Sequence, residues 1–375
     1  MSNNTKLHHN EPLIRLSKKT ALPVWKAWAI RLGAFLFAVL FCAVIILILT
    51  GSNPIEVYRM MFSGSFGTSR KFWNMLQSLA MLLIVSVAVT PAFKMRFWNI
   101  GAEGQVLAGA LGTAAVMIYC GGKLPAAVVY PLMVVTAVVC GMIWAVIPAI
   151  FKALYNTNET LFTLMMNYVA TQLVAYLIVF WEKPKGSNVV GTINNPYGDG
   201  DWFPAVFGQK SFISIAVVLA ITIAMFVYLK YSKHGYEISV VGESENTARY
   251  IGINVKKVIL RTMLLSGAIC GIAGLLLVAG TSSQTISTAT AGGRGFTAIM
   301  VSWLAKFNPI EMILTSFILV FFERGAGEIS SELSQSFASI LTGIVLFCII
   351  GSEFFINYKI NFRKRHKEDK GGEAA

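Results

Sequence analysis

Apolar residues in this sequence come in blocks about 20 residues long, and this length limits what the chain can fold into. An α-helix needs about 20 predominantly apolar residues to cross the ~30 Å hydrocarbon core of a bilayer. Of the 375 residues, 55% are hydrophobic and 13% are charged, and the mean hydropathy is +0.65. Soluble proteins carry about 25% charged residues. The composition therefore excludes a disordered chain and a soluble multidomain enzyme, and it predicts an integral membrane protein.

The blocks predict an all-α, polytopic membrane protein with about ten transmembrane helices, some of them short or broken. The first block has no small-residue cleavage site, so we expect a retained span rather than a removed signal peptide. Only Lys306–Pro309 joins the eighth block to the ninth, which predicts a tight hairpin. The predicted spans are 32–50, 72–93, 97–120, 124–150, 160–181, 212–230, 260–281, 295–305, 309–323 and 336–356.

The basic residues flank these blocks, so membrane topology accounts for the net charge of +13 and no nucleic-acid partner is expected. With a cytoplasmic N-terminus, all but nine of the 31 Lys and Arg residues fall on the cytoplasmic side, as the positive-inside rule requires. Both termini are therefore predicted to be cytoplasmic. The nine exceptions are Arg59, Arg70, Lys71, Lys123, Lys183, Lys185, Lys210, Arg294 and Arg324.

This topology gives a simple domain organisation. Residues 182–211 form a long outer loop rich in Gly, Pro and Asn, and residues 231–259 form a cytoplasmic loop that we expect to be helical. Arg363–Lys367 are expected to bind anionic lipid. The expected parts are a cytoplasmic N-terminal tail (1–26), a transmembrane domain (27–356) and a basic cytoplasmic tail (357–375).

The sequence has no motif for an enzyme. It contains no GxxxxGK[ST], no HExxH and no GxSxG, so we expect neither catalysis nor a bound nucleotide in this chain. An ion-coupled carrier needs ionisable residues deep in its spans. In the first half of the chain Glu103 is the one carboxylate expected at such a depth, which gives that mechanism little support. The ion-coupled carrier and the passive channel remain as alternatives.

Uncharged polar residues concentrate in a few places. Thr160, Thr163, Asn167 and Thr171 recur at spacings of three and four, which places them on one helical face. The segment Trp98–Gln105 places Asn, Glu and Gln beside glycines at the start of a span. Such side chains either form hydrogen bonds between helices or line a path for a polar solute. For the clusters taken together, we favour a path.

Glycines mark two further features. Gly267-xxx-Gly271 allows helix backbones to approach closely. The run Gly292–Gly295 precedes a short span and predicts a broken or re-entrant helix, which is tolerated at that depth only where protein or water covers it.

The cytoplasmic segment Gly242–Asn254 carries helix signals. Acidic residues lead, Glu245 and Arg249 are four residues apart, and Gly252 ends the run. A short helix here either lies on the membrane or is bound by a soluble partner.

Three stretches carry a resemblance to a known family: Asn99–Gln105, Asn158–Tyr168 and Gly242–Gly252. They resemble the permease subunits of ATP-binding-cassette importers, in the branched-chain amino acid and simple-sugar permease family and its nucleoside-uptake branch. The similarity covers roughly residues 30–356. The chain departs from the family pattern at Ser302–Lys306, where a small residue and Leu-Gly are usual, and this affects the expected lining of the path.

The resemblance implies a type II importer-like fold and several partners. A second permease chain, identical or homologous, would form the path with this one. A cytoplasmic ATPase would bind ATP and Mg and dock on the cytoplasmic loop, and an extracytoplasmic binding protein, often a lipoprotein, would deliver the substrate. It places the chain in a bacterial cell membrane, surrounded by lipid.

The resemblance and the polar clusters together give the expected sites. The substrate is expected to be a nucleoside, with a ribose- or galactose-type sugar as the alternative. Trp98, Tyr168 and Phe296 would present an apolar face to a base. The expected path residues are Trp98, Asn99, Glu103, Gln105, Thr163, Asn167, Tyr168 and Phe296, and the expected coupling residues are Gly242, Glu245, Ala248, Arg249 and Gly252.

Overall fold

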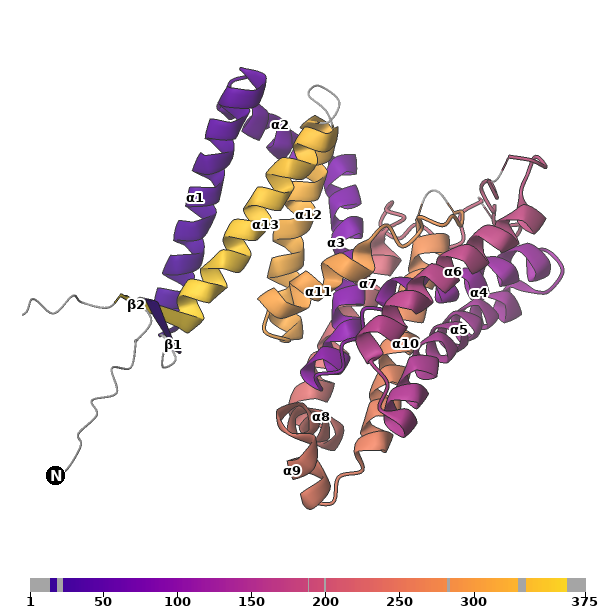
Figure 1. Ribbon diagram of the computed structural model, residues 1–375. Coiled ribbons are helices and arrows are strands. Elements are labelled where there is room, and N and C mark those ends of the chain that lie inside the picture. Colours follow the sequence, from indigo (N-terminus) through magenta and orange to yellow (C-terminus); the bar gives the residue numbers. More distant parts are fainter. Residues whose placement is uncertain are drawn as a thin grey trace, which may run out of the picture. The chain divides into compact units, whose positions relative to one another are not determined.

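The computed structural model describes residues 14–18, 23–187, 189–198, 200–281, 284–329 and 335–362. These residues confirm an all-α, polytopic fold (Figure 1). They form two compact units, one from the described residues up to Arg59 together with those from Ile329 onward, and the other from Met60 to Glu328. The predicted lipid anchor at Arg363–Lys367 and most of the predicted tail 1–26 lie outside the described residues.

The first unit is built on two long helices, α1 (Val24–Thr50) and α13 (Gln335–Asn357). Ala38, Cys42 and Ile46 recur every four residues on α1 and are buried, and the Cys42 Sγ lies 3.9 Å from the Leu341 carbonyl oxygen of α13. Much of the remaining apolar surface of α1 is exposed, as expected for a helix in lipid. The unit also contains the start of α2 (Pro54–Phe66).

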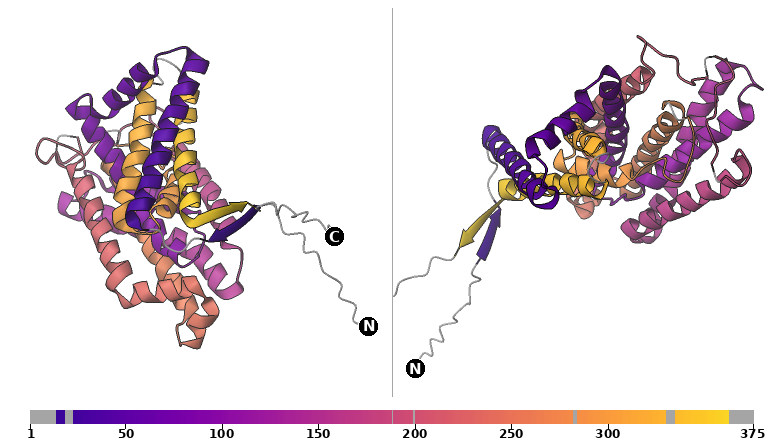
Figure 2. Two further views of the ribbon diagram at one scale, coloured as in Figure 1. Left: turned by 90° about the vertical axis from the view of Figure 1, so that its left-hand side faces the viewer. Right: turned by 90° about the horizontal axis from the view of Figure 1, so that it is seen from above.

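The first unit also contains a feature that the sequence did not predict. Strands β1 (Ile14–Lys18) and β2 (Tyr358–Phe362) pair antiparallel, with Leu16 opposite Ile360, and Figure 2 shows them side by side. The sequence analysis assigns these residues to the two tails.

The second unit is a helical bundle with α10 at its centre. Helix α10 packs against α3, α4 and α5, while α11 packs mainly against α3. The elements of this unit are the rest of α2, then α3 (Ser69–Lys94), α4 (Ala102–Cys120), α5 (Ala126–Tyr155), α6 (Glu159–Trp181), α7 (Phe212–Tyr231), α8 (Lys233–Glu243), α9 (Glu245–Tyr250), α10 (Val255–Ala279), α11 (Arg294–Leu304) and α12 (Pro309–Ile329).

Glycine makes the centre of this bundle possible. Gly271 on α10 lies against Gly109 of α4 on one side and against the backbone of Ala137 on α5 on the other. A Cβ added at Gly109 would lie 2.5 Å from the Gly271 Cα, a distance that real Cβ atoms do not adopt. The close helix approach predicted for Gly267-xxx-Gly271 is therefore confirmed.

About ten full spans is an overestimate for the described residues. Seven helices are long and apolar enough to cross a membrane: α1, α3, α4, α5, α6, α7 and α10. Helix α11 has 11 residues, which cover only about 16 Å at 1.5 Å per residue. Helix α12 has 21 residues, but four of them are charged (Glu311, Glu323, Arg324 and Glu328).

The short link between α11 and α12 is a tight turn, as the sequence predicts. Lys306 and Phe307 both have positive φ angles, of 50° and 61°. The Phe307 N–H donates to the Ser302 carbonyl at 2.9 Å, which closes the end of α11. The chain therefore turns directly from α11 into α12.

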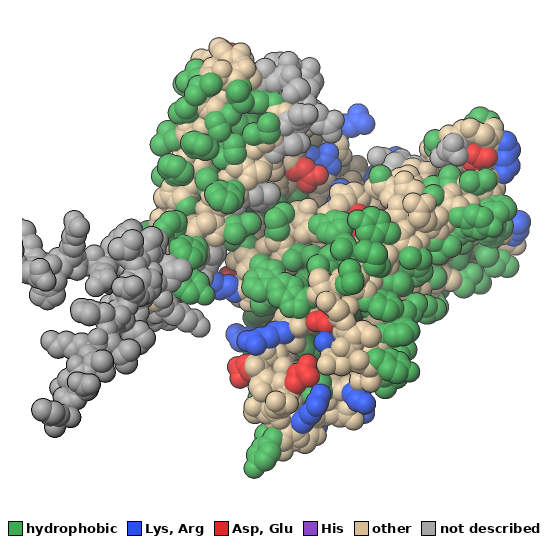
Figure 3. Space-filling model, in the orientation of Figure 1, with side chains coloured by type: hydrophobic (Ala, Val, Ile, Leu, Met, Phe, Trp, Pro, Cys, Tyr) green, Lys and Arg blue, Asp and Glu red, His purple; other side chains and the backbone are tan. Residues whose placement is uncertain are grey.

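The surface of the second unit separates by chemistry. Hydrophobic side chains cover α5 and α6, while Lys, Arg, Asp and Glu gather around α8 and α9 (Figure 3). The exposed apolar side chains include Leu154 on α5 and Leu161 and Val169 on α6. This division is typical of a membrane protein with a cytoplasmic or external polar end.

Candidate functional site

The backbone between α3 and α4 is irregular at residues 95–101, where Arg96 has a φ of 61°. Asn99 in this segment is fully buried and forms a reciprocal pair with Gln105 of α4, at 3.1 and 3.4 Å. The Asn99 side chain also donates to Ser266 Oγ on α10 at 3.3 Å and accepts the Gly101 N–H at 3.1 Å. These bonds hold the segment against the centre of the bundle.

Helix α6 supplies the other partners of this segment. The Asn167 Oδ1 accepts the Gly104 N–H at 2.8 Å, and the Asn167 Nδ2 donates to the Ile100 carbonyl at 2.9 Å. The Thr163 hydroxyl oxygen accepts the Ile100 N–H at 3.2 Å. Buried backbone groups outside a helix need partners of this kind in an apolar surrounding.

The structure therefore brings four predicted path residues into one buried cluster: Asn99, Gln105, Thr163 and Asn167. Their polar atoms bond to one another and to the backbone of residues 100–104. The polar face of α6 is thus turned toward α4, and the exposed face of α6 is mainly apolar. Contact between these four residues and a solute stays a prediction.

Glu103 lies at the first turn of α4, and its carboxylate reaches the start of α11. Its Oε1 accepts the Gly293 N–H and its Oε2 accepts the Gly295 N–H, both at 2.7 Å. The predicted irregular entry at Gly292–Gly295 is present, since Gly292 and Gly293 have φ angles of 62° and 72°. Both segments carry sequence signals, but no sequence pattern predicts the contact between them.

The three predicted aromatic residues are exposed but do not form one cluster. Trp98 stacks on Trp303 of α11, with ring centroids 5.5 Å apart, and the edge of Phe93 packs against Trp98. Phe296 is exposed on α11, and Tyr168 is exposed on α6. Trp303 lies in Ser302–Lys306, the stretch that departs from the family pattern. That departure was the sequence signal that could have pointed to the contact with Trp98.

The loop of residues 231–259, predicted to be cytoplasmic, contains two helices, α8 and α9, rather than one. Ser244 separates them, and its side chain accepts the Thr247 N–H and so caps α9. Gly242, in the last turn of α8, lies against the carbonyl of Lys94, where a side chain has no room. The Glu237 carboxylate of α8 accepts from Arg261 of α10 at 2.8 Å, and this guanidinium holds the pKa of Glu237 below its usual value.

The other predicted coupling residues lie on and after α9. Ala248 lies on the buried face of α9, whereas Arg249 is exposed and pairs with Glu245 at 3.4 Å. Gly252 follows α9 with a φ of 85°. Tyr250, which the sequence analysis did not select, is 92% exposed.

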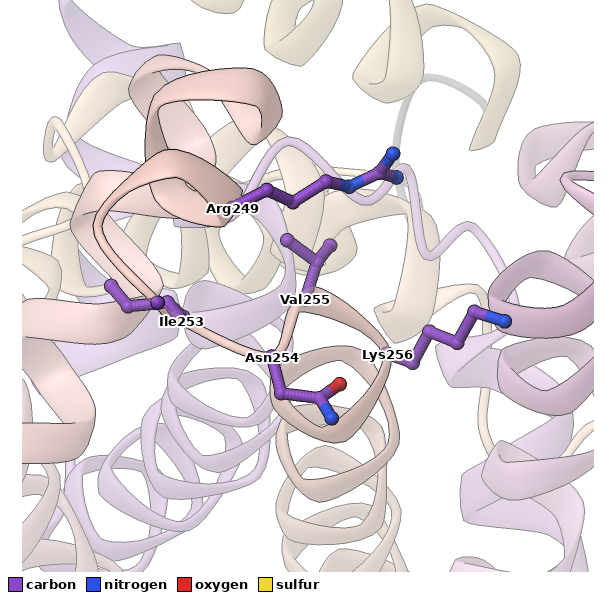
Figure 4. A pocket seen from close by; sticks show the side chains of 6 residues that line it. Arg249, Ile253, Asn254, Val255 and Lys256 are labelled. Carbon is purple, nitrogen blue, oxygen red and sulfur yellow. The ribbon is translucent and has the colours of Figure 1, made fainter.

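A cavity of about 480 Å³ opens where α9 meets α10. Figure 4 shows that the side chains of Arg249 and Lys256 extend toward the same side of this loop. The lining residues are Arg249, Gly252, Ile253, Asn254, Val255 and Lys256. This surface is basic and accessible.

The sequence matches a family described as the permease component of the branched-chain amino acid transport system, over residues 72–350. This range covers most of α3 to most of α13, including the buried polar cluster and helices α8 and α9.

Three characterised relatives align with most of the chain. It is 28% identical over 364 residues to the glucose ABC transporter permease protein TsgB13 of Haloferax volcanii, covering 92% of this chain and 93% of the relative. It is 27% identical to the guanosine ABC transporter permease protein NupP of Bacillus subtilis, with 87% and 93% covered. It is 24% identical to the nucleoside ABC transporter permease protein NupB of Lactococcus lactis, with 85% and 90% covered.

Proposed function

The chain belongs to the family of branched-chain amino acid transport permease components, and from this membership we propose that it is the membrane-spanning permease subunit of an ATP-binding-cassette importer for nucleosides. The observation that carries the proposal is the family match across residues 72–350. The long apolar helices of the described residues support it, since an importer subunit must cross the bilayer.

Nucleosides are the proposed substrates for two reasons. Two relatives that align over most of their own length carry guanosine and nucleoside in their names. The exposed rings of Trp98, Tyr168 and Phe296 could each present an apolar face to a base. The glucose permease relative supports a simple sugar as the second candidate.

The proposed path depends on where the polar residues lie. The buried cluster of Asn99, Gln105, Thr163 and Asn167 supports the shape of the path by holding residues 100–104 in place. We assign direct contact with the solute first to Trp98, Phe296 and Tyr168, whose rings are accessible.

The proposed topology places both termini in the cytoplasm of a bacterial cell, with 27–356 as the membrane domain. Residues 231–259 are then cytoplasmic and 182–211 lie outside. The outer loop has an ordered core in which Trp202 is fully buried and Asp201 accepts from Gln284 at 2.6 Å. We propose this loop as the part of the chain that meets the extracytoplasmic binding protein.

The proposed partner at the cytoplasmic face is a separate ATPase subunit, which would bind ATP and Mg. Helices α8 and α9 support this docking site, because Glu237 and Gly242 hold α8 on α10 and α3 while Tyr250 and Arg249 are exposed. A movement of the ATPase would then reach the membrane helices directly. A second permease chain, identical or homologous, would complete the path.

The test is uptake of labelled guanosine and uridine by cells with and without the gene. An ionophore collapses ion gradients while cellular ATP is maintained, and unlabelled nucleosides and sugars compete. We expect gene-dependent, ionophore-resistant uptake that nucleosides block and glucose does not.

The other outcomes are separable. Competition by sugars alone would show that the substrate is a simple sugar and would leave the importer mechanism intact. Loss of uptake on ionophore addition would replace the ATP-driven mechanism with an ion-coupled carrier, and transport independent of ATP and ion gradients would indicate a passive channel.

A further inference from the structure

The contact between Glu103 and α11 has a geometry that packing alone does not explain. A carboxylate accepts hydrogen bonds with both oxygens, and here each oxygen takes one N–H from the first residues of α11, at 2.7 Å. Hydrogen bonds to a charged acceptor are about twice as strong as neutral ones. The start of a helix also favours negative charge, because its N–H groups have no partner within the helix.

The glycines around this contact fit the carboxylate. A Cβ added at Gly295 would lie 2.5 Å from the Glu103 nitrogen, so α11 approaches the first turn of α4 only with glycine at this position. Gly293 has a φ of 72°, which orients its N–H toward Glu103 at little conformational cost. The run Gly292–Gly295 therefore leaves room for one carboxylate and presents two N–H groups to it.

The opposite end of α11 is held by the same short segment. Trp98, five residues before Glu103, stacks on Trp303 near the end of α11. From Arg294 to Trp303, α11 covers about 14 Å, a distance that residues 98–103 can span. Helix α11 packs mainly against α3 and makes fewer contacts with α4.

We propose that Glu103 is a positioning residue that clamps the start of the short helix α11 to α4. Its carboxylate joins α11 to the bundle of α4, α5 and α10, and it acts on transport by fixing α11 rather than by binding the solute. Glutamine cannot replace it, because its NH₂ group would face one of the two N–H donors.

The first test measures the position of α11 without any substrate. Val301 on α11 is fully buried, so a cysteine in its place reports detachment of the helix. We would introduce Val301→Cys into the full chain with its five native cysteines replaced, and measure labelling by a hydrophilic maleimide in membranes. Glu103→Gln should raise the labelling rate about fivefold or more, since local opening exposes a buried site in proportion to its population.

The matched control is Glu311→Gln. Glu311 also lies in the first turn of a helix, α12, but among the described residues its carboxylate accepts a side-chain hydrogen bond from Asn308 alone, in the adjacent turn, at 2.9 Å. It should leave labelling of Val301→Cys unchanged. Gly295→Ala is a second route to the same opening, because its methyl group pushes against Glu103 while the carboxylate is retained.

The transport arm of the test rests on the proposed function. In cells, Glu103→Gln should lower the maximal rate of nucleoside uptake about tenfold or more while KM changes less than about twofold, as expected when a residue does not bind the substrate. Reduced uptake with unchanged labelling would overturn the clamp, as would labelling and uptake that both equal the wild type. If the wild type imports no nucleoside, the proposed substrate fails, but the labelling result still decides the clamp.

Discussion

The side-chain amide of Asn167 on α6 faces the backbone of Gly104 on α4, with its Oδ1 2.8 Å from the glycine nitrogen. A Cβ at Gly104 would lie 3.0 Å from that same oxygen, so glycine lets the two helices come this close. A single amide thus joins two long helices at the point where α4 begins.

Asn167→Ala should destabilise the protein by about 2–4 kcal/mol, because it leaves the Gly104 N–H and the Ile100 carbonyl without partners in a buried place. Thermal unfolding of the purified protein in detergent would measure this. Asn74→Ala, at an exposed position on α3, is the control. An unchanged melting temperature with uptake lost would instead favour solute contact by Asn167.

Gly271→Ala should prevent α10 from packing closely between α4 and α5, because the new methyl group would clash with the backbone of Ala137. We expect a loss of about 3 kcal/mol or more, in the range of strongly overpacked cores. The yield of monodisperse protein after extraction measures it. Gly343→Ala on α13 has open space around the new methyl group and should be neutral or stabilising by up to about 1 kcal/mol.

Trp98 and Trp303 should be energetically coupled, because their rings stack at 5.5 Å. Replacing each with leucine, alone and together, gives a double-mutant cycle whose interaction energy we expect at about 0.5–1.5 kcal/mol. Unfolding temperatures of the four proteins provide the measurement. Additive effects of the two substitutions would show that the stack contributes no stability.

Lowering the pH should weaken the attachment of α8 to α10, because protonation of Glu237 weakens its ion pair with Arg261. Its pKa is lowered by the hydrogen bond from Arg261, so its contribution to stability is present above the ordinary carboxyl pKa and is lost as the pH falls through the lowered value. Between pH 7 and pH 3 the melting temperature of Glu237→Gln should therefore fall less than that of the wild type. Glu243→Gln, also on α8 but exposed, should follow the wild type.

Ala248→Glu should uncouple the permease from its ATPase. Ala248 is fully buried on the inner face of α9, outside the long apolar helices, so we expect a longer charged side chain to displace α9. Co-purification of the ATPase and nucleoside uptake should both be lost, while the protein still reaches the membrane. Asn246→Glu changes an exposed position on the same helix and should retain both activities, and retention by Ala248→Glu would contradict the coupling role.

Much of the fold follows from local sequence pattern. Block length is sufficient to predict α3 to α7 and α10, and the small-residue spacing at Gly267 and Gly271 is sufficient to predict a close helix contact. Helix α11 is too short to be a full span, and α12 carries too much charge. Both segments are apolar enough that hydrophobicity alone does not distinguish them from the full spans.

The contacts within the candidate site were less predictable, because they join residues far apart in the chain. The spacing of Thr163 and Asn167 predicts one helical face but not what that face meets, and the structure turns it toward residues 100–104. Glu103 and Gly293 are 190 residues apart, and no local pattern pairs them. The pairing of β1 with β2 is missed for the same reason.

The glycine contact at Gly271 limits how the protein can move. Where Gly109, Gly271 and the Ala137 backbone meet, three helices touch main chain to main chain, with no flexible side chains between them to absorb sliding. Helices α4, α5 and α10 must therefore shift as one body. In an importer that alternates between outward and inward access, the helices packed around this body would therefore be the ones that move.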